Sequence, residues 1–587
     1  VGMFLVYSLV ALNVAARRRE LAILRSLGAS PRTLFLLFLC EGMLFGACGW
    51  LLAIPLSSIM VKYLLHGVSQ TISTLFVRVH VEGLVLSPGE IAVSLAVTIA
   101  TAAVAAWQPA REAMGVPPKE AMEISPVNSR RRRSVQRLAL WALTCVLAGV
   151  PLSLLPGVAG VPLPGYLAIL LLFTGFALLS PWMLERLGQW LAPPLQRRAG
   201  IPAYLAGRYL RDCGARTAIS VGALITAVAL FTALVVMIHS FRHTVALWVR
   251  QTVSGDLFVT TKMGQVNRFR FPIPETIVAE LKRMDAGADY VQSRRYLMNY
   301  GDFPYEFEAM GMETFLKHGD FVWLQGDPQK TRPMLIKGEG VLVSEVFATR
   351  TGLHLGDTFQ TQIEGSRIEL PVVGIVRDYR TDGGVVFYSW KHFKERFHDP
   401  QWSGVRFFFK DRPQDLEARV SALRNAIIER WGDALDMVSG KDLRESVLRI
   451  FDETFAITTV LLLIALAVAA LGITTTLTVM VLERTRQLNT LLAVGGSFGQ
   501  IRSMIFWEAS FLVAAGELAG LACGFILSYL LVYVINRQSF GWTFLYVVDW
   551  GALAFSLPLI VLTALAAAVP AVRMVFRTPP AALLRER

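Results

Sequence analysis

The stretch RRRELAILRSLGAS, residues 17–30, decides the fold of this chain, because ERTRQLNTLLAVGGS at residues 483–497 repeats it. One constant offset of 467 residues pairs Leu21 with Leu488 and keeps the two stretches in register. Each copy is short, charged and amphipathic, and each stands between two long apolar runs. We therefore expect two short helices, called the wedges below, that lie flat at the inner face of a membrane. A helix in that position can receive a push from a soluble partner.

The composition is typical of a membrane protein that carries one sizeable soluble part. Of the 587 residues, 54% are hydrophobic and 17% are charged, and the mean hydropathy is +0.49. The formal net charge of +13 comes mostly from arginines beside apolar runs, as the positive-inside rule describes, so we expect no nucleic-acid partner. The five cysteines lie in apolar runs or inner-face segments and lack metal-ligand spacing. This pattern predicts neither a disulfide in the soluble part nor a metal site.

Several runs are long and apolar enough to span a membrane, which takes about 20 residues. Those at 33–65, 454–482 and 501–535 exceed the hydrocarbon thickness and must tilt or project beyond it. The first run begins without an initiator Met, so we expect a longer parent protein. The nine expected spans are residues 1–16, 33–65, 88–109, 138–156, 165–186, 217–240, 454–482, 501–535 and 549–573.

Clusters of arginine orient these spans, because cytoplasmic connections carry an excess of positive charge. Alternation through nine spans places every cluster on the cytoplasmic side, and it places the long insert at 241–453 outside. The arginine clusters and the number of spans are independent observations, and both give the same orientation of the chain in the membrane. The clusters lie at residues 17–32, 130–137, 197–216, 484–502 and 573–587.

The insert has the pattern of a mixed α/β domain. Short apolar or alternating runs predict strands, and the turn at 364–366 predicts a hairpin between two of them. The expected strands are VLVS (341–344), TFQTQI, RIELPVVGIV, VVFYSW and VRFFFK, and the expected helices are residues 391–397 and 413–430, the second with Leu416, Val420, Leu423 and Ile427 on one face.

Both edges of the insert show helical spacing that continues into the neighbouring span. The apolar positions are Phe241, Val245, Trp248 and Thr252 before the insert, and Leu443, Val447, Phe451 and Phe455 after it. Two amphipathic helices that leave the membrane would pair into a stalk, since their apolar stripes need a partner outside lipid. Ordinary edge helices of the domain are the alternative.

Signatures of chemistry are absent from the sequence. It contains no GxxxxGK[ST] phosphate loop, HExxH, GxSxG or CxxC pattern, so the chain cannot bind ATP through a phosphate loop. His239 and His243 stand one helical turn apart without a third ligand, which favours interfacial packing over metal binding. We expect no catalytic residue, no cofactor and no metal.

Two carboxylates occupy equivalent places inside spans, where charge is costly. Glu41 and Glu508 could relay protons or bond to a neighbouring helix, and the absence of further acids or histidines beside them favours the second. Glu517 has no counterpart in the first copy, and its role stays open. Small residues near both acids favour close helix packing. These glycines are Gly42, Gly46, Gly49, Gly516, Gly520 and Gly524.

The wedges are the strongest candidate site. Apolar residues at helical spacing form one face about two turns long, and Gly28 and Gly495 stand where a helix ends in the left-handed conformation. A helix that only connects two spans at the membrane interface would explain one copy of the wedge, but not two copies in register. The candidate contact residues are Arg19, Glu20, Leu21, Leu24, Arg25, Leu27, Gly28 and Ala29 in the first wedge, and Gln487, Leu488, Leu491, Leu492, Val494, Gly495 and Gly496 in the second.

At these residues the sequence resembles the FtsX-like, MacB-type permeases of ABC transporters. RRRELAILRSLGASPRTLFLLFLCEG follows the family pattern closely, whereas Gln487 and Leu492 replace the acid and the base found at Glu20 and Arg25. The second copy is the more degenerate one, which puts equal partner contact by the two wedges in doubt. PAREAMGVPPKEAME, PAVRMVFRTPPAALLRE, YLAGRYLRDCGART and VLVSEVFATRTGLHLGDTFQTQ also match segments of the family.

The resemblance implies a polytopic α-helical membrane protein with an inserted extracytoplasmic α/β domain, of the MacB periplasmic-core type, on a helical stalk. The first repeat lacks its opening span and outer domain. The implied regions are a first FtsX-like repeat (1–125), two linker spans (126–200), an elbow helix with the first span of the second repeat (201–240), the outer domain with stalk helices (241–453) and the second FtsX-like repeat (454–587).

The resemblance also implies a function. A separate, dimeric ATPase subunit would bind ATP-Mg and dock under the wedges, and the stalk would carry its motion outward through the bacterial cytoplasmic membrane to export or extract a lipid, lipoprotein, peptide or hydrophobic compound. An accessory protein outside the membrane fits the same scheme. An ion-coupled secondary transporter, or a sensor or scaffold without an ATPase, are the alternatives.

Overall fold

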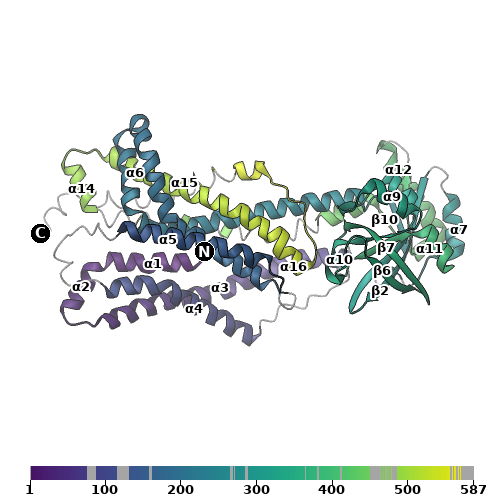
Figure 1. Ribbon diagram of the computed structural model, residues 1–587, viewed down its shortest axis with the longest axis horizontal. Coiled ribbons are helices and arrows are strands. Elements are labelled where there is room, and N and C mark those ends of the chain that lie inside the picture. The colour runs from purple at the N-terminus through teal and green to yellow at the C-terminus, as the bar shows by residue number, and fades with distance from the viewer. Residues whose placement is uncertain are drawn as a thin grey trace.

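The computed structural model describes ten main segments of the chain, together with isolated residues near 264 and 269, between 460 and 478 and between 558 and 569. Figure 1 shows an elongated molecule with long helices at one end and a sheet domain at the other. The main segments are residues 2–75, 87–115, 131–157, 161–262, 271–284, 288–363, 365–379, 383–409, 413–449 and 485–555.

The first repeat forms a bundle of three long helices and one wedge. Ser87 starts the last of these helices with a capping box, in which its hydroxyl accepts from Glu90 N–H and the Glu90 carboxylate accepts from Ser87 N–H. Val10, Phe38 and Ala106 meet in the bundle core. The elements are α1 (Gly2–Ala16), α2 (Arg18–Ser26), α3 (Pro31–Leu75) and α4 (Pro88–Met114).

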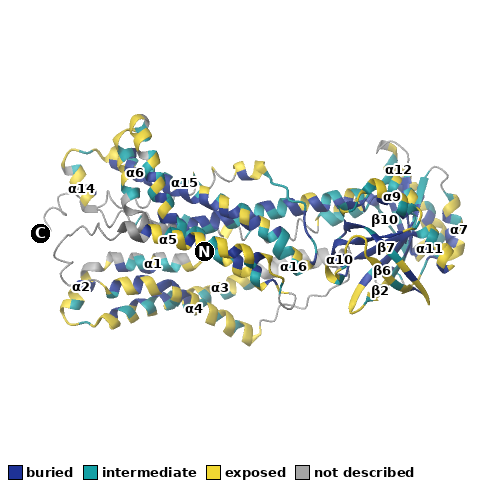
Figure 2. Cartoon of the chain, viewed as in Figure 1, coloured by how far each residue is buried: buried dark blue, intermediate teal, exposed yellow. Residues whose placement is uncertain are grey.

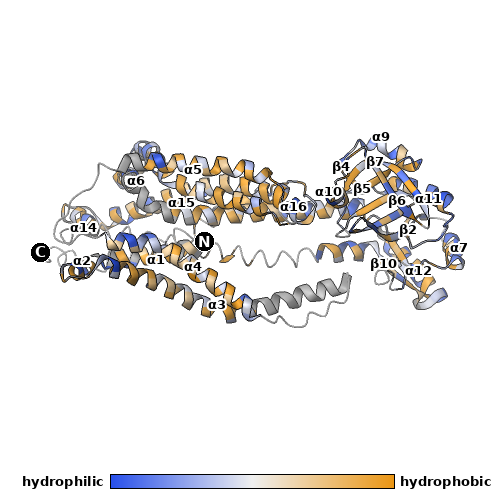
Figure 3. Cartoon of the chain, turned by 60° about the horizontal axis from the view of Figure 1, so that its bottom comes forward, coloured by the Kyte–Doolittle hydropathy of each residue, from blue (hydrophilic) through white to orange (hydrophobic). Residues whose placement is uncertain are grey.

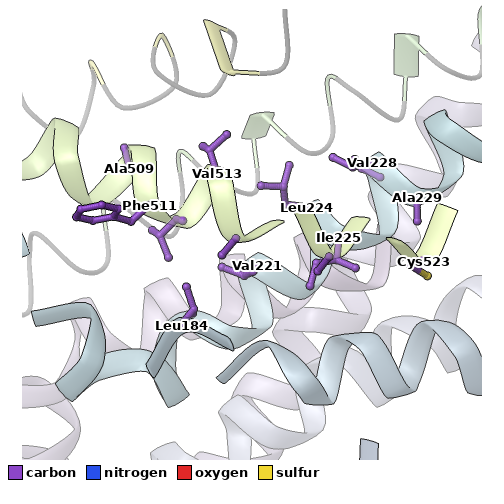
Figure 4. Close-up of a cluster of buried hydrophobic side chains, with 14 of the residues drawn as sticks. Leu184, Val221, Leu224, Ile225, Val228, Ala229, Ala509, Phe511, Val513 and Cys523 are labelled. Carbon is purple, nitrogen blue, oxygen red and sulfur yellow. The ribbon is translucent and has the colours of Figure 1, made fainter. Parts of the chain in front are cut away.

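The second membrane unit is built on α6 (Leu163–Gln251), which packs against the long helix α15. Gly200, at φ +80° and ψ −171°, breaks α6 into two helical parts, so two expected spans and the elbow between them belong to one element. Figure 4 shows Val221 and Leu224 of α6 near Val513 of α15, and Val228 farther along toward Cys523. The other elements are α5 (Arg131–Leu154), α14 (Thr485–Ala493), α15 (Phe498–Leu530), the π-helix η3 (Leu531–Ile535) and α16 (Asn536–Phe540).

Six helices in the described part of the chain are long and apolar enough to cross a membrane, and each coincides with an expected span. Figure 3 colours much of these helices orange, for hydrophobic residues, and Figure 2 marks many of their residues as exposed, as is expected of helices that face lipid. The expected span at 1–16 is helix α1, of 15 residues. Most of 454–482 and 549–573 lies outside the described residues. The six are Pro31–Ile59, Pro88–Met114, Val135–Leu154, Leu163–Arg197, Leu224–Gln251 and Phe498–Phe540.

The outer domain is a ten-stranded mixed sheet, in the order β10-β1-β9-β2-β3-β8-β5-β7-β4 with β6 paired to β7. The expected strands are confirmed as β5 to β9, including the β6–β7 hairpin, whereas β1 to β4 and β10 were not expected. The strands are β1 (Leu257–Thr261), β2 (Ala288–Tyr300), β3 (Phe303–Met310), β4 (Val322–Gln325), β5 (Val341–Ser344), β6 (Thr358–Ile363), β7 (Ser366–Arg377), β8 (Val385–Ser389), β9 (Gly404–Phe409) and β10 (Leu435–Ser439).

Short helices cover the sheet. The expected helices are confirmed as α11 and α12, and Val420, Leu423 and Ile427 of α12 are buried against the sheet as expected. The helices are α7 (Glu275–Met284), α8 (Met312–His318), α9 (Pro328–Ile336), α10 (Glu345–Thr351), α11 (Trp390–Phe397) and α12 (Pro413–Trp431), followed by the turn η2 (Gly432–Ala434).

A stalk joins the outer domain to the membrane helices. After its kink at Gly200, helix α6 is continuous through its second span to Gln251. The buried Trp248 near this end packs with Val447 and Leu448 of the helical segment 440–449. The predicted pairing of the two edge helices is confirmed over this part, while residues 451 and 455 lie outside the described residues.

The upper end of the stalk is fixed to the sheet by a buried ion pair. Arg406 donates through Nη1 to the carbonyl of Thr252, which caps α6, and through Nη2 to Glu308. Glu308 is fully buried, and Arg295 also donates to it at 3.2 Å. A buried carboxylate needs such partners, so this network holds the last turn of α6 against β3 and β9.

Candidate functional site

The two wedges have the same backbone structure. Helix α2 spans Arg18–Ser26 and α14 spans Thr485–Ala493, which are equivalent positions in the repeat. Both end at a left-handed glycine, Gly28 at φ +99° and Gly495 at φ +105°. A side chain at this φ is strained, so glycine is required for the sharp turn.

The same hydrogen bond closes both wedges. Ala29 N–H donates to Leu24 O at 3.0 Å, and Gly496 N–H donates to Leu491 O at 2.8 Å. These bonds satisfy carbonyls that a helix C-terminus otherwise leaves unpaired. The repeat predicted from sequence is therefore also a repeat of hydrogen bonds.

A serine starts the next helix at the same point in both copies. Thr33 N–H donates to Ser30 Oγ and Gln500 N–H donates to Ser497 Oγ, each at 3.2 Å. Such N-caps fix where the helix starts. Each wedge is thus joined through a short ordered turn to a long span, α3 or α15. These serines were not among the residues expected from the sequence.

One leucine of each wedge points into the protein. Leu21 is buried with Leu34 and Phe38 of α3, and Leu488 is buried with Ile501 of α15, the equivalent partner. Buried side chains cannot touch a partner protein. This corrects the expectation that all apolar wedge residues share one partner-facing surface: Leu21 and Leu488 attach the wedges to the spans.

Two further apolar residues of each wedge face outward. Leu24 and Leu491 are 44% and 41% exposed, and Leu27 and Val494 are 79% and 82% exposed. The near-equality of each pair means that the two copies present the same apolar patch. Uncovered apolar residues that recur at matched places are typical of a contact surface.

The polar rims of the patches differ. Glu20 and Gln487 are both exposed at equivalent positions, so the first patch carries an acid and the second an amide. Arg25 is half-buried and donates through Nη1 to Met114 O at the end of α4, whereas Leu492 packs against the core of α15. Ala29 and Gly496 are half-buried, and the side chain of Arg19 lies outside the described residues.

The equivalent carboxylates lie in helix contacts. Glu41 accepts a 2.6 Å hydrogen bond from Asn13 Nδ2, which ties α3 to α1 as the packing interpretation expects. Glu508 is buried in α15. Glu517 is half-buried on the same helix.

Five of the six candidate glycines lie at close helix contacts. Gly42 and Gly46 of α3 face Ala106 and Ala102 of α4, so closely that a Cβ on Gly46 would lie 2.7 Å from the Ala102 Cβ. Gly516, Gly520 and Gly524 face Leu224, Val228 and Thr232 of α6. Gly49 is the exception, since a Cβ there meets no described atom within 4 Å. The expected packing role of Gly49 is therefore wrong for the described part of the chain.

The wedge site has the geometry of a docking surface. Within the described residues, no group of three His, Cys, Asp or Glu side chains could hold a metal ion. The Nδ1 atom of His239 lies 3.3 Å from the Asp549 carboxylate, so this side chain contacts the segment that follows residues 541–547 of the chain. Figure 1 places α2 and α14 at the end of the molecule opposite the outer domain.

Two protein-family models match the chain. The FtsX-like permease C-terminal model matches residues 1–118 and again 459–580, which include the two wedges. The MacB-like periplasmic core domain model matches residues 217–426, which include most of the sheet.

The chain is also similar to several known proteins. The chain is 28% identical over 550 residues to an uncharacterized ABC transporter permease protein of Mycobacterium tuberculosis, covering 92% of this chain and 63% of that relative's length. The periplasmic region of MacB from Actinobacillus actinomycetemcomitans has 10% identity and a TM-score of 0.25, covering 33% of this chain and 92% of its own. The extracellular domain of the noncanonic ABC-type transporter YknZ from Gram-positive bacteria has 14% identity and a TM-score of 0.23. The match covers 32% of this chain and 99% of that domain. The chain is a multi-pass membrane protein whose membrane repeats match the FtsX-like permease C-terminal model and whose outer domain matches the MacB-like periplasmic core domain model.

Proposed function

We propose that this chain is the non-catalytic membrane subunit of an ABC transporter, and that a separate ATPase subunit docks on the exposed wedge patches. The observation that carries the proposal is the matched exposure of Leu27 and Val494 on two structurally equivalent helices. Two like patches on one chain suit a partner that itself has two like binding grooves, as a dimeric ATPase has. ATP-Mg would then bind to the partner, and this chain would need no cofactor.

The arrangement of the long helices supports coupling across the membrane. Each wedge joins a span through a capped turn, and α6 continues beyond its span into the stalk, whose last turn Arg406 fixes to the sheet. A nucleotide-dependent shift of the wedges would therefore bias the position of the outer domain. The wedges would lie on the cytoplasmic side of the bacterial cytoplasmic membrane, where ATP is available.

The outer domain would be the working end. Family resemblance suggests export or extraction of a lipid, lipoprotein, peptide or hydrophobic compound, with an accessory protein outside the membrane as a further partner. Among the aromatics of β2 and β3, Tyr305 and Phe307 are buried and serve the core, whereas Phe303 is 40% exposed. Tyr305 and Phe307 therefore serve packing within the outer domain.

Charge placed on the patches tests the docking. We expect Leu27→Asp combined with Val494→Asp to weaken co-purification with the proposed ATPase subunit by at least about tenfold, because each buried aliphatic side chain contributes about 1.5–3 kcal/mol. Ile428→Asp is the matched control, since Ile428 is an exposed aliphatic residue of the outer domain. Full ATPase binding by the double variant would overturn the proposal.

A further inference from the structure

The loop that follows α16 lies along the base of the stalk. Within this loop, residues 541–547 are called the strap below. Leu545 N–H donates to Thr244 Oγ1 at 2.9 Å, and Val547 N–H donates to Ser240 Oγ at 3.1 Å. Ser240 Oγ in turn donates to Val547 O at 3.0 Å. Ser240 and Thr244 are buried on α6, so the strap is bonded to the stalk helix by two buried hydroxyls.

Aromatic side chains join the strap to both neighbours. The rings of Phe544 and of Phe241 on α6 pack edge to face, with their centroids 4.8 Å apart. The ring centroids of Trp542 and Tyr379 are also 4.8 Å apart. Tyr379 belongs to the outer domain, just after β7, and its ring also contacts Trp248. Three segments far apart in sequence therefore share one aromatic cluster.

The outer domain also bonds the strap directly, through Thr543. The carboxylate of Glu345, the first residue of α10, accepts from Thr543 N–H at 3.1 Å and from Thr543 Oγ1 at 2.7 Å. Tyr379 donates its hydroxyl to Thr543 O at 3.2 Å. The backbone N–H and C=O of Thr543 are thus both bonded to the outer domain, and Figure 1 shows α10 beside α16.

A carboxylate in this position is unusual for simple packing. Glu345 and Thr543 are both buried, and Arg377 Nε lies 3.9 Å from the Glu345 carboxylate. Burial raises the pKa of Glu345, while the Thr543 bonds and Arg377 act in the opposite direction. Burying a charge is costly unless it is bonded, so the site is stable only while the strap supplies its two donors.

The strap leads back to the second wedge through continuous helix. It is preceded by α16, η3 and α15, which form an unbroken run from Phe498 to Phe540, and the capped turn at Ser497 joins this run to α14. A displacement of α14 can therefore reach the outer domain along α15 and the strap, without passing through the stalk.

We propose that the strap is a second mechanical link between the second wedge and the outer domain, and that Glu345 is the positioning residue that fastens it. This inference rests on the proposed function, because the link has work to do only if an ATPase moves the wedges. The stalk and the strap then act in parallel, and the outer domain follows α15 as well as α6.

The test measures how ATP moves the outer domain in the full chain bound to its ATPase in lipid nanodiscs. Spin labels at Ile428→Cys in α12 and Val93→Cys at the outer end of α4 report the displacement, in a chain whose native cysteines are replaced by alanine. Both positions are exposed. We expect Glu345→Ala to reduce the ATP-driven displacement, since it loosens one of two parallel connections and leaves the Tyr379 contacts to hold the strap to the outer domain, without weakening ATPase binding.

Conservative variants distinguish the loss of the link from misfolding of the chain. Thr543→Val removes one donor to Glu345 and keeps the shape, so it should reduce the displacement, and Thr543→Ser, which restores the hydroxyl, should recover it. Glu369→Ala is the matched control, because Glu369 is an exposed carboxylate paired only with Arg367 among the described side chains.

The outcomes separate the two proposals. If the chain with native Glu345 and Thr543 shows no ATP-driven displacement, both the proposed function and the link are wrong. If it shows a displacement that Glu345→Ala and Thr543→Val leave unchanged, only the link is wrong. A displacement that falls in both variants and recovers in Thr543→Ser supports the link.

Discussion

Single residues carry much of the order in the outer domain, and Asp399 is the clearest case. Its carboxylate accepts from Arg294 Nε at 2.8 Å and from the Tyr296 hydroxyl at 2.5 Å. Burial alone would raise the pKa of Asp399, but these bonds outweigh it and hold the pKa below the ordinary value of 3.8. The ionised form is therefore favoured by folding.

The sign of the pH dependence follows from that shift. Because the unfolded chain holds the Asp399 proton more tightly, the contribution of Asp399 to stability is present above pH 3.8 and is lost as the pH falls below it. We expect Asp399→Asn to lower the stability of the outer domain by about 2 kcal/mol at pH 7, and by less at pH 3. Thermal unfolding of the full chain at both values, followed by tryptophan fluorescence, measures this. An equal loss at both pH values would contradict it.

Residue chemistry also explains which strands the sequence could predict. Strands β5, β8 and β9 are short apolar runs, and their pattern suffices. Strand β2 contains Arg294 and Arg295, whose charges hide its strand pattern. Arg294 is paired with Asp399, which is distant in sequence, and Arg295 is paired with Glu308 on the neighbouring strand β3. Such pairing cannot be seen before the fold is known.

At the scale of elements, the helices predicted from the repeat are the most reliable part of the sequence analysis, because two copies in register constrain each other. The division of the wedge leucines was not predictable in the same way. Leu21, Leu24 and Leu27 recur at helical spacing, and only the position of α3 decides that Leu21 is covered while Leu27 is not.

The strap was missed although its sequence carried a signal. Trp542, Phe544 and Tyr546 stand at every second position, and this period of two indicates an extended segment with its aromatic side chains on one face. The segment forms none of the sheet strands, and it lies instead on α6 through the hydroxyls of Ser240 and Thr244. A pattern of strand type can thus mark a segment that packs on a helix.

The glycine contacts between α6 and α15 predict how a larger side chain would affect the packing of these two helices. A Cβ on Gly520 would lie 2.6 Å from the Cβ of Val228, so Gly520→Leu must push the two helices apart. We expect a destabilisation of about 1–3 kcal/mol, the usual range for overpacking. Thermal unfolding of the full chain in detergent measures it.

Gly49 provides the matched control. It also lies within a membrane helix, but a Cβ there meets no described atom within 4 Å. Gly49→Leu should therefore leave the unfolding temperature nearly unchanged. Equal effects of the two substitutions would mean that the close contact at Gly520 does not hold the helices together.

At the scale of the whole molecule, the wedges and the outer domain occupy opposite ends of a long helical body (Figure 1). Positive charge predicted this arrangement, because arginines crowd the wedge end. The position of the outer domain relative to the membrane helices could not be predicted from sequence, since it depends on the strap and on the ion pair of Arg406 with Glu308.

Labelling in intact cells tests the arrangement. In a chain whose native cysteines are replaced, we expect Phe303→Cys to react with a membrane-impermeant maleimide added outside, and Val494→Cys to react only after the membrane is permeabilised. Both side chains are exposed, so accessibility within the protein does not limit either reaction. Reaction of Val494→Cys from outside would reverse the topology.

The uncovered tips Leu27 and Val494 have a consequence for how the subunit is made. In a solitary chain these side chains stay wetted by water, a state that favours self-association. If the proposed ATPase covers these side chains, a cell that makes this subunit in excess of the ATPase would accumulate copies with uncovered apolar tips, which tend to aggregate. Balanced synthesis of the two subunits would then be an advantage.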